Sequence, residues 1–313
     1  MSTRETPLAV DDAARGYRDG AAAGAAVKAV AQRSARGGGP STDALIRQTT
    51  FDRFLCRVFA TGDGAFVLKG GTGMLARMPR GRATRDIDLA ATDLDLDTAV
   101  TELVERTSLD LGDHFRFVFR TRTAQIEGDN QPYIRGCRLA FDAYLGVTPR
   151  GIVSTDLAVG YHPTSPPERV TPSNRLAELR FVGHDYLQYP LADQVSDKVC
   201  ATLQLYGDGG RPSSREKDLV DLALIASSQA LDAEQLRVAL ATEFRRRGLE
   251  PVQAFTVPPH WGAAYRRLAG ETSLSTLAPT VAEAVSMTGR LLDPVLDGTV
   301  TAGTWHPNRQ AWA

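Results

Sequence analysis

The sequence contains little lysine and little cysteine. Of the 36 basic residues in the 313-residue chain, only four are lysines. The three cysteines, Cys56, Cys137 and Cys200, lie far apart, so they offer neither a disulfide framework nor a Cys-x-x-Cys metal pair. An odd number of widely spaced cysteines is typical of a reducing compartment, and this predicts a cytoplasmic protein.

Long apolar runs and net charge are also missing. No stretch of about 18 apolar residues occurs, which excludes a membrane-spanning helix. The Ala-rich segment 21–31 lacks the preceding basic cluster and the cleavage site of a signal peptide. The formal net charge of −1 argues against a protein that coats nucleic acid by bulk electrostatics. Local arginine clusters leave room for a restricted basic surface.

The composition is otherwise that of a globular protein, with 42% hydrophobic and 23% charged residues. The length predicts two folded units. We expect an α+β (mixed α/β) protein in four segments. These are a flexible extension with one helix over residues 1–40, a catalytic lobe with a mixed β-sheet over 41–162, a Pro-rich linker over 163–174, and a mainly helical lobe over 175–313.

Hydrophobic periodicity predicts the individual elements. Helices are expected over residues 42–59, 98–107, 191–206, 214–228, 233–247, 260–268 and 277–292, and strands over 65–68, 86–91, 115–123, 133–144, 151–159 and 176–182.

One local motif points to phosphate chemistry. The predicted strand 65–68 is followed by Lys69-Gly70-Gly71-Thr72, and after thirteen intervening residues the next strand begins with Asp86-Ile-Asp88. A Gly-Gly turn lets backbone N–H groups approach an anionic ligand, and a helix starting near Thr72 adds its positive end. Asp86 and Asp88 point to one side of their strand because side chains alternate, and Ile87 points into the core.

Two adjacent carboxylates repel each other unless a cation lies between them. Hard divalent ions such as Mg²⁺ prefer carboxylate oxygens together with substrate phosphates. An acidic strand end facing water is the simpler interpretation of an isolated Asp-x-Asp, but the preceding Gly-Gly-Thr favours a metal-dependent nucleotide site.

These residues resemble the signature of the nucleotidyltransferase superfamily. The sequence is more similar to the AbiEii/AbiGii toxin family, which includes the mycobacterial MenT toxins. Gln194-x-x-x-Lys198 resembles the family's helical motif with an essential lysine, and Arg215-Glu-Lys-Asp-Leu-Val-Asp221 resembles its Arg-x-Lys-Asp motif. The resemblance runs from about Thr42 to Ser228.

The resemblance implies roles for these positions. Asp86, Asp88, Lys198 and Asp218 would be catalytic, Lys69, Gly70, Gly71, Thr72 and Lys217 would bind the nucleotide, and Asp86, Asp88 and Asp156 would hold the metal. Ser213-x-x-Glu216 reads as a capping box that starts the helix carrying Lys217. Asp221 is expected to fix that helix or Lys217 rather than to contact substrate.

Two further positions have alternatives. The third carboxylate of the superfamily, a metal ligand or a base, is Asp156 on a later strand, with Asp142 on the preceding strand as its rival. Thr84 lies two residues before Asp86, where related toxins carry a hydroxyl that a partner antitoxin phosphorylates in some members. A phosphate on Thr84 would repel both nucleotide and metal-binding carboxylates.

The resemblance therefore implies a toxin that transfers NMP from an NTP to the 3′ end of tRNA. It would use Mg²⁺, or Mn²⁺ in its place, release pyrophosphate, block aminoacylation and translation, and pair with a cognate antitoxin. Arginines beside the motif, Arg77, Arg80, Arg82 and Arg85, are expected to contact RNA phosphates. The alternatives are an aminoglycoside-type nucleotidyltransferase, a metal-dependent glycosyltransferase, and a non-catalytic module that binds RNA or a partner on the same fold.

Overall fold

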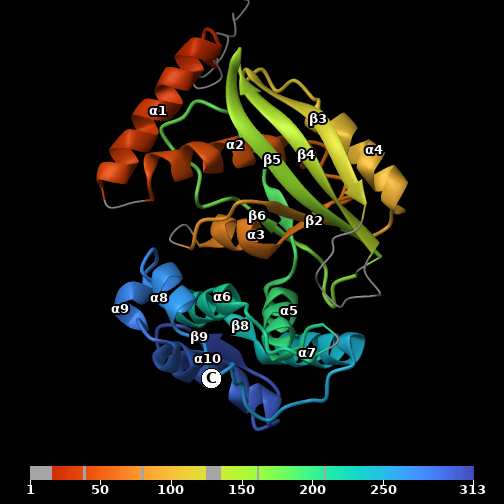
Figure 1. Cartoon of the computed structure of the whole chain (residues 1–313), viewed down its shortest axis with the longest axis vertical. Coiled ribbons are helices and arrows are strands. Elements are labelled where there is room, and N and C mark those ends of the chain that lie inside the picture. Colours follow the sequence, from red (N-terminus) through yellow and green to blue (C-terminus); the bar gives the residue numbers. More distant parts are fainter. Residues whose placement is uncertain (1–15, 38–39, 79–80, 125–134, 161, 208) are drawn as a thin grey trace, which may run out of the picture.

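In the computed structural model the chain forms two stacked parts. The upper part is a β-sheet with its accompanying helices, and the lower part is a helical bundle (Figure 1). The structure describes residues 16–37, 40–78, 81–124, 135–160, 162–207 and 209–313. The predicted strand residues 133–134 and Arg80 lie outside these ranges. In the described part of the chain, no helix is long and apolar enough to cross a membrane.

The upper part is built on a seven-stranded mixed sheet, as predicted for the fold class. Its strands run in the order β3-β4-β5-β2-β1-β7-β6. They are β1 (Val67–Lys69), β2 (Ile87–Ala91), β3 (Phe115–Ala124), β4 (Arg135–Leu145), β5 (Thr148–Val159), β6 (Glu168–Val170) and β7 (Tyr186–Gln188). β2 is parallel to β5 and antiparallel to β1, so these three strands lie side by side at the centre of the sheet.

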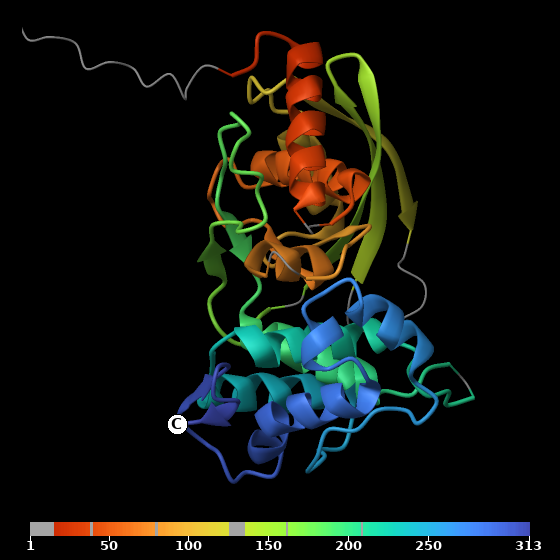
Figure 2. The same ribbon diagram turned by 90° about the vertical axis from the view of Figure 1, so that its left-hand side faces the viewer.

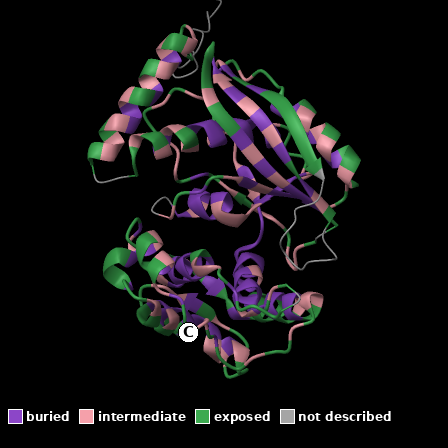
Figure 3. Cartoon of the chain, in the orientation of Figure 1, coloured by how far each residue is buried: buried purple, intermediate pink, exposed green. Residues whose placement is uncertain are grey.

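Four helices accompany this sheet. They are α1 (Gly20–Arg36), α2 (Thr42–Val58), α3 (Gly70–Arg77) and α4 (Leu96–Thr107). The apolar faces of α2 and α4 pack against the sheet, and their core includes the fully buried Phe54, Leu103 and Phe141. Figure 3 shows this buried layer between sheet and helices.

The helix α1 packs against the body of the protein. Ala23 and Val27 belong to the core of the upper part, and α1 runs across α2 (Figure 2). At its start, a Cβ on Gly20 would lie 2.5 Å from the Cα of Gly146, so only glycine permits this close approach. Residues 16–37 therefore do not form the loosely held extension that their Ala- and Gly-rich composition predicts; residues 1–15 lie outside the described ranges.

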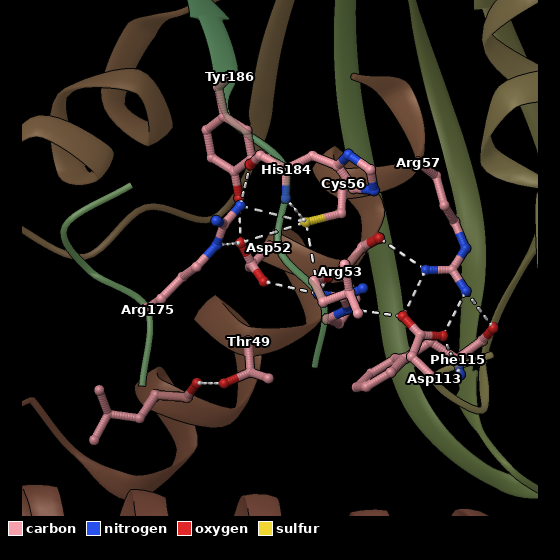
Figure 4. Close-up of polar contacts among 12 residues, drawn as sticks. Thr49, Asp52, Arg53, Cys56, Arg57, Asp113, Phe115, Arg175, His184 and Tyr186 are labelled. Carbon is pink, nitrogen blue, oxygen red and sulfur yellow. Dashed lines mark hydrogen bonds and ion pairs between the residues drawn. The ribbon is translucent and has the colours of Figure 1, made fainter. Parts of the chain in front are cut away.

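Two buried arginines of α2 share one carboxylate (Figure 4). Arg57 binds both oxygens of Asp113 at 2.7 and 3.0 Å, and Arg53 Nε donates to Asp113 at 2.7 Å. Burial alone would raise the pKa of Asp113, but its hydrogen bonds and charge pairing with Arg57 and Arg53 outweigh burial and lower that pKa. A planar guanidinium makes such bidentate pairs and an ammonium does not, which gives arginine a structural use here.

Replacing Asp113 with Asn should destabilise the protein strongly. Two guanidiniums would remain buried without their carboxylate, at a cost of about 3–5 kcal/mol in the free energy of unfolding. Urea titration at pH 7 measures this cost. Because the fold lowers the pKa of Asp113, the wild-type advantage should be complete above its ordinary pKa of 3.8 and be lost as the pH falls below it.

The matched control is Asp142→Asn, which breaks the half-exposed pair of Asp142 with Arg120. Such surface pairs contribute about 0–1 kcal/mol. Equal losses in the two variants would contradict the structural role of the Asp113 cluster.

The sheet extends beyond the predicted lobe boundary. β6 lies inside the segment 163–174 that was expected to link the lobes, and β7 lies inside the expected helical lobe. β7 pairs with β1, and β6 pairs with β7. The strand predicted over 176–182 is wrong, because those residues form turns and irregular chain. The helical part begins at Leu191.

The lower part contains the helices α5 (Leu191–Leu203), α6 (Glu216–Ser228), α7 (Ala233–Arg247), α8 (Ala263–Ala269), α9 (Leu274–Leu277) and α10 (Val281–Leu296). A small sheet of β8 (Leu231–Asp232), β9 (Thr304–His306) and β10 (Ala311–Trp312) joins them. Its Trp305 is fully buried and donates from Nε1 to the carbonyl of Ala226 on α6, 2.9 Å away. α6 is thereby anchored at the centre of the bundle.

Candidate active site between the two parts

Charged side chains form a row across the centre of the sheet. Lys69 of β1 is in register with Asp88 of β2, Asp88 with Asp156 of β5, and Asp156 with Arg138 of β4. Residues in register on neighbouring strands point to the same face. The strand pairing therefore places one lysine, two aspartates and one arginine side by side, and Asp86 lies next to them two residues before Asp88.

Asp88 is the central residue of this row. Burial raises its pKa to about 6; Lys69 opposes that shift, whereas the nearby charges of Asp86 and Asp156 add to it. A carboxylate with a raised pKa is one whose negative charge its surroundings do not fully compensate. A cation bound here would compensate it.

Both glycines of the Gly-Gly turn are required by close contacts. Gly70 has φ +65°, and a Cβ there would lie 1.9 Å from Oδ2 of Asp88. A Cβ on Gly71 would lie 2.7 Å from the side chain of Thr84. The first turn of α3 begins at Gly70, so its backbone N–H groups and positive end lie next to the carboxylate row.

Gly70→Ala should therefore impair catalysis more than stability. The new methyl group displaces Asp88, and a displacement of about 1 Å at a reacting centre costs roughly 100-fold in rate. Nucleotidyl transfer measured beside Gly112→Ala separates this effect from backbone strain. Gly112 has a similar φ of +67° with open space around its Cβ position. A Gly70→Ala enzyme as active as the Gly112→Ala control would show that the contact with Asp88 is unimportant.

Thr72 has a different position from the predicted one. Its hydroxyl donates to the backbone carbonyl of Asp86 at 2.7 Å and lies 2.9 Å from the hydroxyl of Thr84. Because Thr72 uses its only proton on Asp86, Thr84 is the donor between the two hydroxyls. Thr72 is buried and outside the catalytic cavity, and it ties α3 to the start of β2 instead of facing a phosphate.

The helical part supplies a buried lysine. Lys198 of α5 donates to Asp218 at 3.1 Å and to Asp221 at 2.7 Å, both on α6. Burial alone would lower the pKa of Lys198, but Asp221 and Asp218 outweigh it and raise that pKa, so the lysine is charged. Arg215 pairs with the second oxygen of Asp218 at 2.6 Å.

One ion pair joins the two parts across this site. Arg82, in the loop before β2, binds both oxygens of Asp221 at 3.0 and 2.9 Å. Asp221 therefore holds Lys198 and Arg82 in place, two partners that its expected role of fixing its helix or Lys217 did not include. The predicted capping box is also absent: the Ser213 hydroxyl donates to the carbonyl of Ala201, and Glu216 accepts from backbone N–H groups of residues 262 and 265.

A cavity of about 290 Å³ connects these groups. From the upper part it is lined by Lys69, Gly70, Gly71, Arg82, Thr84, Asp86, Asp88, Arg138, Asp156 and Tyr189, and from the lower part by Gln194, Asp197, Lys198, Arg215, Lys217, Asp218 and Arg247. The structure thus brings together every predicted site residue except Thr72. The strand pairing also separates the rivals for the third carboxylate, because Asp156 lines the cavity and Asp142 does not.

Comparison with known proteins identifies the family. The model of the nucleotidyl transferase AbiEii toxins of type IV toxin–antitoxin systems matches residues 53–287, three quarters of the chain. The chain belongs to the AbiEii nucleotidyltransferase toxin family. It is therefore a nucleotidyltransferase, and the resemblance inferred from the motifs is confirmed. Among curated proteins, none matches.

Three solved structures are similar to this chain, and the first of them supports the same fold. MenT4, the nucleotidyltransferase toxin Rv2826c from Mycobacterium tuberculosis H37Rv, is 18% identical with a TM-score of 0.57, over 86% of this chain and 89% of that one. JHP933 from Helicobacter pylori is 12% identical with a TM-score of 0.42, over 82% of this chain and 92% of that one. A putative nucleotidyltransferase from H. pylori is 12% identical with a TM-score of 0.44, over 83% and 97%.

The AbiEii cavity suits a divalent ion that substrate helps to hold. Nucleotidyltransferases of this kind use an NTP and a divalent metal ion. Within the described ranges, no three carboxylate, imidazole or thiol groups converge into a metal site. Two carboxylates completed by phosphate oxygens and water are the usual Mg²⁺ arrangement. Asp86 and Asp88 fit it, whereas Arg138 already binds both oxygens of Asp156, at 2.6 and 2.7 Å.

Sequence reasoning missed Arg138 and the part played by Arg82. Arg138 enters the site only through the register of β4 with β5, which no local pattern encodes. Arg82 was predicted, with the neighbouring arginines, to contact RNA. In the structure its guanidinium instead donates to both carboxylate oxygens of Asp221. For Arg82, the only local sequence signal was its position two residues before Thr84, which the structure buries.

Proposed function

We propose that this AbiEii protein transfers an NMP from an NTP to the 3′ end of tRNA, and so blocks aminoacylation and translation. The observation that carries the proposal is the single cavity in which the Lys69–Asp88–Asp156 row faces the Lys198–Asp218 pair. The acceptor's 3′ oxygen attacks the α-phosphorus, the bond to the bridging oxygen breaks, pyrophosphate departs, and the hydroxyl proton is released to solvent.

Each group has a stated part in this reaction. Asp86 and Asp88 would hold Mg²⁺, or Mn²⁺, which when bound neutralises charge on the triphosphate. Backbone N–H groups at Gly70 and Gly71 approach the phosphates, with Lys69 and Lys217 on either side. Lys198, held charged by Asp218 and Asp221, offsets the charge that develops on the transferred phosphoryl group.

The charge of the cavity favours RNA over an aminoglycoside. Basic residues outnumber acidic ones around the cavity by seven to five. A polycationic drug would meet Arg82, Arg138 and Arg215 near the carboxylates, whereas a polyanionic RNA is attracted to them. The glycosyltransferase and the non-catalytic module lose their support, because the chain belongs to a nucleotidyltransferase family.

Labelled nucleotides test this proposal. The protein is incubated with Mg²⁺, total tRNA and each α-labelled NTP in turn, beside Asp86→Ala. We expect label in RNA with at least one nucleotide for the wild type and none for the variant. Absence of label with all four nucleotides would refute tRNA transfer.

We also propose that Thr84 regulates the enzyme, with a cognate antitoxin as the modifying partner. The side chain of Thr84 is buried between the catalytic cavity and a second cavity lined by residues of α2. Its hydroxyl lies 2.9 Å from the hydroxyl of Thr72. Thr84→Asp should lower transfer by about tenfold or more through repulsion of Asp86 and Asp88, and Thr84→Ser should keep it. Steady-state transfer rates compare the two, and full activity of Thr84→Asp would count against regulation at this position.

A further inference from the structure

A second hollow lies beside the catalytic cavity, entirely on the helical part. It has a volume of about 670 Å³ and shares Arg215 and Lys217 with the catalytic cavity. The loop before α6, the first turn of α6 and one face of α8 line it, through Tyr206, Arg211, Pro212, Ser214, Arg215, Glu216, Lys217, Ala264, Arg267 and Leu268. We call this surface the basic groove. The two hollows therefore adjoin at Arg215 and Lys217.

The basic groove has a net positive charge, because four basic residues and one acidic residue line it. Its one acidic lining residue, Glu216, uses its carboxylate to accept the N–H groups of Gly262 and Tyr265 at 2.9 and 2.7 Å. Arg211, Lys217 and Arg267 are exposed, and in the described ranges none of them forms an ion pair with a carboxylate. Three solvated cations side by side form a site for a polyanion.

The backbone under these cations is held firmly. Tyr206 and Arg211 exchange two backbone hydrogen bonds of 2.8 and 2.9 Å. Ser213 donates its hydroxyl to Ala201 of α5 at 3.0 Å, and its carbonyl accepts the indole N–H of Trp261 at 2.8 Å. The contacts of Glu216 fix α8 to α6. The groove is thus built on anchored elements, which lowers the cost of ordering it around a ligand.

Two of the arginines near the Asp-x-Asp motif are already paired with carboxylates. Arg82 is bound to Asp221, and Arg77 pairs with Glu168 at 2.7 Å. Arg80 lies outside the described residues. On the helical side, the exposed cations of the basic groove include Lys217, which also lines the catalytic cavity.

We propose that the basic groove binds the phosphodiester backbone of the RNA acceptor just before its 3′ end. This inference rests on the proposed function, because it assumes that the acceptor is RNA. An acceptor whose terminal hydroxyl reaches the α-phosphorus must leave the cavity along one of its walls. The wall formed by Arg215 and Lys217 leads into the groove, where Arg211 and Arg267 meet the next phosphates.

The test compares Arg211→Glu/Arg267→Glu with Arg245→Glu. Both target residues are exposed, so the fold should be unaffected, and Arg245 is an exposed cation of α7 that lines neither hollow. Binding of labelled tRNA is measured by filter retention at several salt concentrations, and binding of a labelled NTP is measured separately. The groove variant should bind tRNA at least roughly tenfold more weakly. The slope of the logarithm of its tRNA association constant against the logarithm of salt concentration should fall in magnitude by roughly 1.4, because each lost contact to a single-stranded phosphate removes about 0.7.

The outcomes separate this inference from the proposed function. Weaker tRNA binding in the groove variant alone, with unchanged NTP binding, supports the groove even if no NMP is transferred to tRNA; in that case only the proposed function fails. Equal tRNA binding by the groove variant and Arg245→Glu would overturn the groove while NMP transfer stands. A wild-type protein that binds NTP but no RNA would overturn it as well.

Discussion

Replacing Asp88 with Asn is expected to lower nucleotidyl transfer by at least about 1,000-fold, an effect of the size seen when a preorganised charged group at a reacting centre is lost. Asp88 is the middle residue of the Lys69–Asp88–Asp156 row, and its neighbours set its charge. Asn keeps the shape of the side chain, so its contact with Gly70 is retained. The loss would therefore report on charge at this position.

The same substitution should leave stability intact or raise it. Because burial raises the pKa of Asp88 to about 6, its ionised form is disfavoured in the fold. The penalty is present above pH 6 and disappears below the ordinary pKa of 3.8. In the absence of metal and nucleotide, Asp88→Asn should unfold at equal or higher urea concentration than wild type at pH 8, with the difference vanishing near pH 4.

Transfer assays with Asp142→Asn as the control complete this experiment. Asp142 is the other aspartate considered for the third carboxylate, and it pairs with Arg120 outside the cavity. The control should retain transfer. Asp88→Asn activity within tenfold of wild type would remove Asp88 from the catalytic machinery.

Lys198→Arg is expected to lower transfer by roughly 100-fold although it preserves charge. Lys198 is buried between Asp218 and Asp221, and the guanidinium of Arg82 already binds both oxygens of Asp221. A wider planar group in this space must displace Arg82 or turn toward the cavity. An ammonium acts on a phosphate as a compact point charge, and a guanidinium does not reproduce that geometry.

The control for this variant is Lys28→Arg, at the one lysine remote from the cavity. Lys28 is an exposed residue of α1, so its replacement should leave both kcat and KM for NTP unchanged. For Lys198→Arg the expected change lies mainly in kcat, because the lysine acts on charge that develops during transfer. Undiminished kcat would show that only the charge at this position matters.

Much of the site could be predicted from short patterns. The alternation in Asp86-Ile87-Asp88 predicts which side chains share a face, and the structure buries Ile87 completely. Lys198 and Asp218 lie on separate helices, and only the family resemblance predicted that they belong to one site. Arg138 could not be predicted, because its place beside Asp156 depends on pairing between strands.

The lobe boundary shows why composition misleads. Prolines between residues 163 and 172 suggest a linker, but the three-residue strand β6 fits between them. Strands this short carry no readable alternation. The Ala- and Gly-rich start of the chain likewise predicts flexibility, whereas its small residues let α1 approach Gly146 closely.

The scarcity of lysine has a physical counterpart in the structure. Three of the four lysines, Lys69, Lys198 and Lys217, line the catalytic cavity. Arginines such as Arg53 and Arg57 instead make buried, forked pairs with carboxylates. The buried arginines thus bind carboxylates, whereas the proposed function has the lysines of the cavity act on phosphate.

The central claim, transfer of NMP to the 3′ end of tRNA, is tested most directly with an acceptor that lacks its terminal hydroxyls. Intact tRNA and periodate-oxidised tRNA are each incubated with the protein and an NTP labelled at the α- or the γ-phosphate. We predict label from the α-phosphate in intact tRNA only, and none from the γ-phosphate. Equal labelling of oxidised tRNA, or label from the γ-phosphate, would contradict the proposed reaction.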